Sequence, residues 1–220
     1  MQIKHLACAA AMLAFGVAHA APVSFQFTGV VDKAGDFGVA LGAEVSGVIT
    51  YDTATQPDFE SGPIGPGLNL QLVSYNLTGI GSFDVNLAGK QLTTSTMGAT
   101  IRDNLGGNHE EQIDFSGSGV KLDGLAYSGA YAVLTLATRP GVSDVLDRNL
   151  PSSINLADFD APYFAHYGAV FKGDGLDSST LTFNVTSITA VPEPASVVSM
   201  SLGLVGVLGL SLRRRRAFQA

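Results

Sequence analysis

Apolar and polar side chains alternate at every second position in many stretches between residues 21 and 190, and this pattern limits the fold more than any other feature. Residues 23–28, 45–51 and 181–186 show it clearly. Successive side chains of a strand point to opposite faces of a sheet, so each stretch predicts a strand with one buried face. No long stretch with helical periodicity stands out in the same range.

Three further stretches, residues 83–87, 113–115 and 131–136, follow the same strand periodicity. Residues 131–136 are apolar on nearly both faces, which is typical of a central strand. Glycine-containing turns separate most of the stretches. The sequence therefore predicts an all-β fold, an antiparallel β-sandwich or jelly-roll-like body.

Two segments interrupt the strand pattern. Residues 56–67 contain three prolines and three glycines, so we expect a surface loop there. Residues 149–167 carry four aromatic side chains among Asp and Pro residues, namely Phe159, Tyr163, Phe164 and Tyr167. These rings could form a sugar-stacking platform, or they could pack a long loop onto the sandwich. We favour packing, because aromatic residues dominate the energetics of most cores.

The predicted body is more acidic than the formal net charge of -7 suggests. Five of the 12 basic residues are Lys4 and residues 213–216, and one of the 19 acidic residues is Glu193. Residues 21–190 therefore hold seven basic and eighteen acidic side chains, a net charge of -11. An acidic surface repels a phosphate backbone, so we expect no nucleic-acid partner.

The first 20 residues have the three parts of a secretory signal peptide. Lys4 supplies the positive charge, residues 6–17 form the apolar run, and Ala18 and Ala20 form an A-x-A cleavage site. Cleavage would make Ala21 the first residue of the mature protein. It would also remove Cys8, the single cysteine, which excludes disulfides and thiolate sites from the body.

The C-terminal region predicts a membrane anchor. Residues 195–212 form an uncharged apolar run, and Arg213, Arg214, Arg215 and Arg216 follow at once. As a helix the run would span about 27 Å, close to the ~30 Å of a bilayer core. The arginines should stay on the cytoplasmic side. We therefore expect one transmembrane helix at residues 195–212, with the body outside.

The tripeptide Pro192, Glu193 and Pro194 precedes this apolar run. The prolines should end the last strand and hold the segment extended. The order of Pro-Glu-Pro, glycine-rich apolar helix and arginine cluster, over residues 191–216, resembles the PEP-CTERM sorting domain, also classified as an ice-binding-protein C-terminal domain.

The resemblance implies a partner and a location. An exosortase-like membrane enzyme would recognise Pro192, Glu193 and Pro194, and Arg213 to Arg216 would be the retention signal. The protein would be anchored transiently in the inner membrane, with its body outside, and would then reach the cell surface or the extracellular biofilm matrix. A permanent tail anchor with a proline-rich stalk is the alternative.

A search for chemistry in residues 21–190 gives no catalytic, cofactor-binding or metal site. Nucleophile, phosphate-loop and dinucleotide motifs are absent from the sequence. His109, Glu110 and Glu111 are adjacent, but neighbouring strand residues point to opposite faces, so we expect a polar loop. Eighteen acidic residues give too many pairs to single out a glycoside hydrolase dyad.

We therefore divide the chain into a signal peptide (1–20), a β-sandwich body (21–190) and a sorting signal (191–216). The hypothesis is an exported, non-enzymatic surface or matrix protein, with extracellular polysaccharide as a possible partner. A carbohydrate-binding module is the first alternative, and exposed aromatics on a concave sheet face would favour it. A secreted carboxylate-dependent hydrolase is the second, and two carboxylates facing each other across a cleft would favour it.

Overall fold

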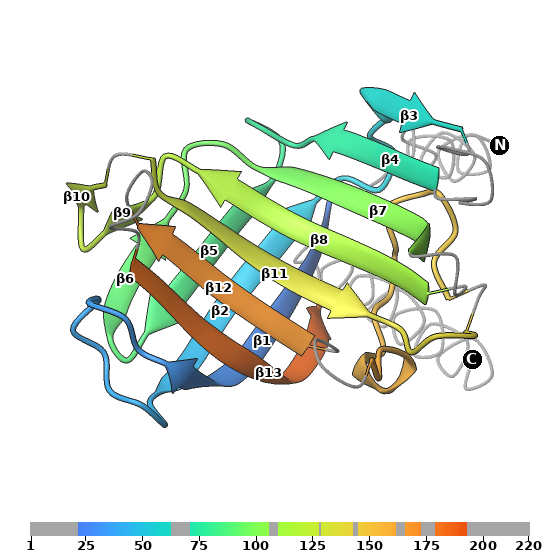
Figure 1. Cartoon of the computed structure of the whole chain (residues 1–220). Helices are drawn as coiled ribbons and strands as arrows, with labels where there is room; N and C mark the ends of the chain where they lie inside the picture. The colour runs from blue at the N-terminus through green and yellow to red at the C-terminus, as the bar shows by residue number, and fades with distance from the viewer. Residues whose placement is uncertain are drawn as a thin grey trace, which may run out of the picture.

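A single antiparallel sheet of 13 strands forms the body, as a computed structural model shows (Figure 1). The structure describes residues 22–62, 71–105, 110–127, 129–142, 145–161, 166–172 and 179–192. Along the sheet the strands follow the order β10-β9-β6-β5-β2-β1-β13-β12-β11-β8-β7-β4-β3. The first and last strands of the body, β1 and β13, are thus neighbours in the middle of the sheet.

The strands vary from two to thirteen residues in length. They are β1 Val23–Lys33, β2 Glu44–Tyr51, β3 Phe59–Ser61, β4 Gln71–Asn76, β5 Ser82–Leu87, β6 Lys90–Thr93, β7 Gly98–Leu105, β8 Glu110–Ser118, β9 Lys121–Leu122, β10 Leu125–Ala126, β11 Tyr131–Ala137, β12 His166–Lys172 and β13 Ser179–Val191. A short 3-10 helix, η1, spans Leu156–Asp158. The edge strands β3 and β10 are very short, which limits the unpaired backbone that a sheet edge presents.

The sheet curls so that its two halves face each other. Strand β5 of one half contacts β8 of the other, and the ring of Tyr51 on β2 stacks on Phe115 of β8 at 5.3 Å between centroids. Only two residues separate β8 from β9, which pairs with β6 in the opposite half. The predicted all-β antiparallel fold is confirmed, and the two layers belong to one continuous sheet.

The alternation in the sequence follows the two faces of this sheet. On β5, Phe83, Val85 and Leu87 are at most 1% exposed, whereas the residues between them are half-buried. On β2, Val45, Ile49 and Tyr51 are buried in the same way. The strand at residues 131–136 lies between β8 and β12, so its predicted central position is confirmed.

Aromatic rings from four strands form the centre of the core. The ring of Phe27 on β1 lies 6.3 Å from that of Phe83 and 6.1 Å from that of Phe183 on β13. The ring of Phe25 stacks on Tyr51 at 5.9 Å. Burying one such side chain contributes about 1.5–3 kcal/mol, and an aromatic pair adds about 0.5–1.5 kcal/mol. Core packing of this kind stabilises the body in place of disulfides.

Residues 138–142 and 145–161 follow β11 and pack against β2, β4 and β8; part of this stretch is seen beside the ends of β7 and β8 in Figure 1. The Glu111 carboxylate on β8 accepts hydrogen bonds from the backbone N–H groups of Val145 (2.9 Å) and Leu146 (2.6 Å). The hydroxyl of Tyr51 donates to the carbonyl of Pro151 at 2.7 Å, and that of Tyr75 donates to the carbonyl of Arg148.

The two predicted loops need correction at particular positions. The first, residues 56–67, contains strand β3, which pairs with β4. In the second, Phe159 is 2% exposed and packs into the core, as we favoured. Tyr167, however, lies on β12 rather than in a loop, because residues from His166 onward pair with β11 and β13. Tyr163 and Phe164 lie outside the described residues.

Candidate functional site

The end of β13 is the point where the predicted sorting signal leaves the body. This strand runs between β1 and β12 and ends at Val191. Its last buried residue is Ile188, and Val191 is 38% exposed. Pro192 follows and is exposed. Proline has no backbone N–H to continue a ladder, so the strand ends where the sequence predicted.

The start of β1 lies beside this exit. Ser24 pairs with Val191, and Phe25 pairs with Ala190. The start of β1 and the end of β13 therefore lie side by side, although about 170 residues separate them in sequence. Both ends of the body leave the sheet at one place, the β1–β13 pair.

A second candidate site lies on the outer face of the sheet. Polar side chains form a row across six neighbouring strands, each residue paired with the next: Ser74, Thr100, Asp114, Thr135, Tyr167 and Asn184. We call these residues the transverse row. Sequence reasoning missed the row, because each strand contributes only one member and the register of pairing decides which residues meet.

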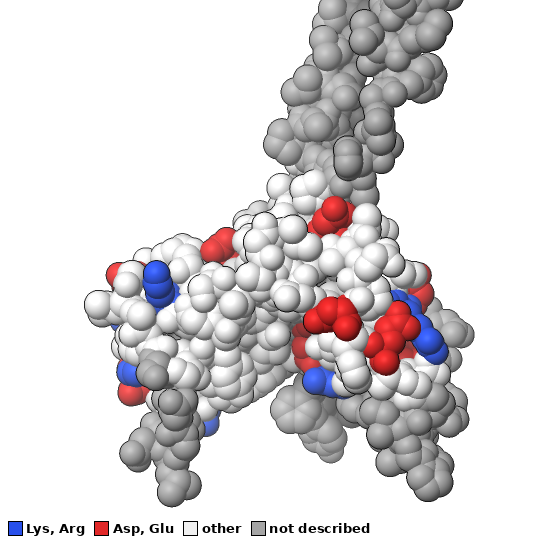
Figure 2. All heavy atoms as spheres, turned by 90° about the horizontal axis from the view of Figure 1, so that it is seen from above, with Lys and Arg blue, Asp and Glu red and all other residues white. Residues whose placement is uncertain are grey.

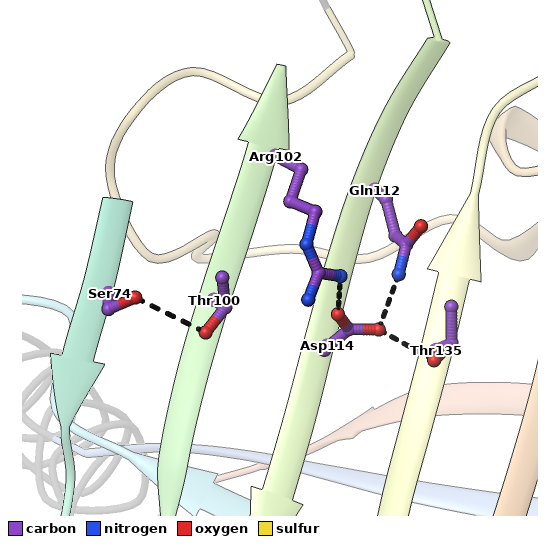
Figure 3. A network of polar contacts seen from close by, with 6 residues as sticks. All are labelled: Ser74, Thr100, Arg102, Gln112, Asp114 and Thr135. Atoms are coloured by element: carbon purple, nitrogen blue, oxygen red, sulfur yellow. Dashed lines mark hydrogen bonds and ion pairs between the residues drawn. The ribbon is translucent and has the colours of Figure 1, made fainter. Parts of the chain in front are cut away.

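Asp114 is the centre of a hydrogen-bond cluster in this row (Figure 3). Its carboxylate accepts from the guanidinium of Arg102, from Gln112 Nε2 at 2.7 Å and from Thr135 Oγ1 at 2.6 Å. The Asp114 side chain is about 10% exposed. With three donors around a buried carboxylate, Asp114 links the side chains of β7, β8 and β11 and has a structural role.

Beside the cluster, a groove of about 480 Å³ runs across β4, β7 and β8 to β11. Gly98 of β7 lies at its floor, and the hydroxyls of Ser74, Thr100, Ser116 and Ser118 line it. Asp58 is the one carboxylate among the lining residues. The groove therefore presents groups that both donate and accept hydrogen bonds.

An aromatic side chain closes the β11 end of the groove. Tyr131 is 45% exposed and pairs with Ser118 of β8 on one side and with Phe171 of β12 on the other. Its ring stacks on that of Phe171 with 4.3 Å between centroids and 15° between planes. Phe171 lies on the β12 side and the groove on the β8 side, so the other face of the Tyr131 ring is turned toward the groove.

The charges near these sites are dispersed. Figure 2 shows acidic side chains scattered over the face seen from above, with basic side chains beside several of them and in no single patch. Burial and the charge of Asp32 raise the pKa of Tyr167 in the transverse row. Within the described residues, no three His, Cys, Asp or Glu side chains come together as a metal site would require.

The structure places the sequence-predicted site residues as follows. Pro192 is described and exposed at the exit from β13. Ala18, Ala20, Ala21, Glu193, Pro194 and Arg213 to Arg216 lie outside the described residues. The predicted signal peptide and the predicted helix at 195–212 do so too. Among the residues that are described, no helix has the length and apolar character that a membrane crossing needs.

The polar loop expected at residues 109–111 needs correction, because Glu110 and Glu111 belong to a strand. His109 lies outside the described residues, whereas Glu110 and Glu111 begin strand β8. Glu111 is 3% exposed and points inward, where it holds residues 145 and 146. A buried carboxylate with backbone donors is a structural anchor.

The central strand β13 leads directly into Pro192, the first residue of the Pro-Glu-Pro tripeptide. Residues 190–216 match the family model of the PEP-CTERM protein-sorting motif. The chain therefore carries a PEP-CTERM sorting motif, which indicates an exported protein that an exosortase, a membrane enzyme, processes. Neither the curated proteins nor the solved structures gave a match to this chain.

Proposed function

We propose that this chain is a non-enzymatic protein of the cell surface or the extracellular matrix, held transiently in the inner membrane until an exosortase-like enzyme removes its C-terminal segment. One observation carries the proposal. The matched motif begins at residue 190, inside the last two residues of β13, so the sorting signal is a direct continuation of a central strand.

This continuity sets an upper limit on the distance between the body and the proposed membrane anchor. Seven residue steps separate Ile188, the last buried residue, from Ala195, where the predicted helix begins. An extended chain covers at most about 23 Å over these steps. The processing enzyme must therefore act close to the end of the β1–β13 pair, and the exposure of Val191 and Pro192 leaves that place accessible.

The experiment measures the mass of the protein from a host that carries an exosortase and from one that lacks it. We expect loss of the helix and the four arginines only in the first host. If the protein keeps Leu212 and the arginines in both, the segment is a permanent anchor and the proposal is wrong.

A variant with Arg213 to Arg216 replaced by Ser tests retention in the membrane. We expect less of this variant than of the wild-type protein in the membrane fraction, because the apolar run is only marginally long enough to span a bilayer.

A carbohydrate-binding role for the body is the second candidate function. The exposed ring of Tyr131 beside a hydroxyl-lined groove favours it. A carboxylate-dependent hydrolase gains no such support from this groove, because Asp58 is the only carboxylate among its lining residues. Release of reducing ends from glycans, measured with the purified chain, would instead favour the hydrolase.

A further inference from the structure

We propose that the groove across β4, β7 and β8 binds a neutral glycan chain, with the Tyr131 ring as its stacking wall. This inference rests on the proposed function, because it names the chemistry by which the exported body would hold extracellular polysaccharide. The groove crosses three gaps between strands, from β4 to β11. At about 4.8 Å for each gap, it is about 14 Å long, which suits a short run of sugar rings rather than one.

The lining of the groove matches the hydroxyl groups of a sugar. Serine and threonine hydroxyls donate and accept, as sugar hydroxyls do, so they can bond in either sense. Asn76 adds a carboxamide whose Oδ1 already accepts from the backbone N–H of Thr78 at 3.1 Å. This bond orients the side chain, whose Nδ2 carries two donors that a sugar hydroxyl could use.

The aromatic wall suits the apolar face of a pyranose ring. Because Tyr131 is stacked on Phe171 at 4.3 Å, its ring is held upright before any ligand arrives. A side chain that is already ordered loses little conformational entropy on binding. The floor is open because Gly98 has no side chain there; a Cβ would lie 3.2 Å from the Tyr75 carbonyl oxygen and 3.8 Å from Ser116 Oγ.

The charges favour a neutral glycan over an anionic one. Asp58 lies in the groove, and the body carries a net charge of -11. The nearest cation on β7, Arg102, is already paired with Asp114. The lining residues include no cation that would offset the repulsion of a polyanionic chain.

The test uses the full chain purified in a sugar-free zwitterionic detergent, so that no detergent head group competes. Hexasaccharides of β-1,4-glucan, β-1,3-glucan and β-1,4-mannan are the neutral probes, and an oligogalacturonate is the anionic one; binding is measured by isothermal titration. We expect at least one neutral hexasaccharide to bind. Tyr131→Ala should weaken that binding about tenfold or more, because it removes the stacking surface.

Matched variants separate the site from the fold. Tyr131→Phe keeps the ring and should bind within about threefold of wild type. Ser116→Gln fills the groove and should weaken binding, whereas Leu125→Ala, at a side chain 67% exposed on β10, should change nothing. The inference is wrong if no neutral hexasaccharide binds, if only the oligogalacturonate binds, or if Tyr131→Ala binds as well as wild type. None of these outcomes alters the mass measurement that tests sorting.

Discussion

The ring of Phe183 on β13 lies directly over Gly168, its partner on β12. A Cβ at Gly168 would lie 2.0 Å from Phe183 Cζ. The same arrangement recurs on the other side of β1, where a Cβ at Gly47 would lie 2.3 Å from Phe27 Cζ. The two rings stack with 6.1 Å between centroids. The central aromatic stack is therefore possible because Gly168 on β12 and Gly47 on β2 have no side chain and leave room for the two rings.

Gly168→Ala should lower the free energy of unfolding of the body by about 1–3 kcal/mol, because the added methyl group forces the Phe183 ring out of its place. Urea unfolding followed by circular dichroism measures the change. Gly62→Ala is the matched control, since a Cβ there meets nothing within 4 Å. Equal stability of Gly168→Ala and wild type would show that the ring can move at no cost.

Glu111→Ala should release the segment at residues 138–161 from the inner face of the sheet. Two backbone N–H groups would lose a charged acceptor, and each such bond contributes about 1.5–3 kcal/mol. Limited trypsin digestion measures the release by faster cleavage after Arg148, since trypsin does not cleave the bond between Arg139 and Pro140. Glu110→Ala removes the neighbouring carboxylate and should leave the cleavage rate as in wild type. Unchanged cleavage in Glu111→Ala would mean that other contacts hold the segment.

The body should lose stability as the pH rises above 10. Burial raises the pKa of Tyr51 far above its ordinary value of 10, so the folded protein keeps this proton while the unfolded chain releases it. The free energy of unfolding then falls by up to about 1.4 kcal/mol per pH unit for this group. Tyr51→Phe should reduce this slope between pH 10 and 11. An equal fall in the free energy of unfolding with pH in wild type and in Tyr51→Phe would contradict the prediction.

Removal of β13 should prevent the body from folding, although it is the last strand in the sequence. It lies between β1 and β12 and contributes the buried residues Leu181, Phe183 and Val185. A chain that ends at Lys172 should lack a cooperative thermal transition, while a chain that ends at Pro192 should keep it. A cooperative transition in the shorter chain would show that the sheet closes without its central strand.

Glu193→Ala or Pro194→Ala should block removal of the C-terminal segment in a host with an exosortase, while the body stays folded. Both residues follow the end of β13 in the sequence, and Ile188 is the last buried residue of that strand, so we expect neither change to disturb the core. Intact mass measures processing. Thr189→Ala, at an exposed position of β13, should be processed like wild type. Normal processing of both tripeptide variants would show that the enzyme does not recognise the Pro-Glu-Pro sequence.

Much of the fold could be predicted from local pattern. Period-two alternation gave the inward residues of β2, β5 and β13, because burial of one face is encoded strand by strand. Strands β4 and β7 were missed, and of β12 only its end at Val170 and Phe171 was expected. In β7, Gly98 faces outward and Ala99 faces inward, and in β12 Gly168 and Ala169 face opposite sides of the sheet. Small residues on both faces weaken the alternation of apolar and polar side chains on which strand prediction depends.

The candidate site was predicted only at the sorting junction. Pro192, Glu193 and Pro194 are contiguous, so their order is visible without a structure. Tyr131, Ser116 and Gly98 come from three strands, and only pairing in one register places them around one groove. Tyr131 lay in a stretch predicted as a central strand, and nothing in that pattern marks its ring as exposed.

The sequence by itself determined that the body is all-β, that one cysteine allows no disulfide within the chain, and that the chain carries a C-terminal sorting motif. These properties depend on composition, on alternation between near neighbours and on contiguous residues. Only the tertiary structure decided that β1 and β13 meet, so that both ends of the body leave at one place, and that Tyr131 stacks on Phe171 beside a polar groove. Strand order and register depend on contacts between residues far apart in the chain, and local periodicity does not specify them.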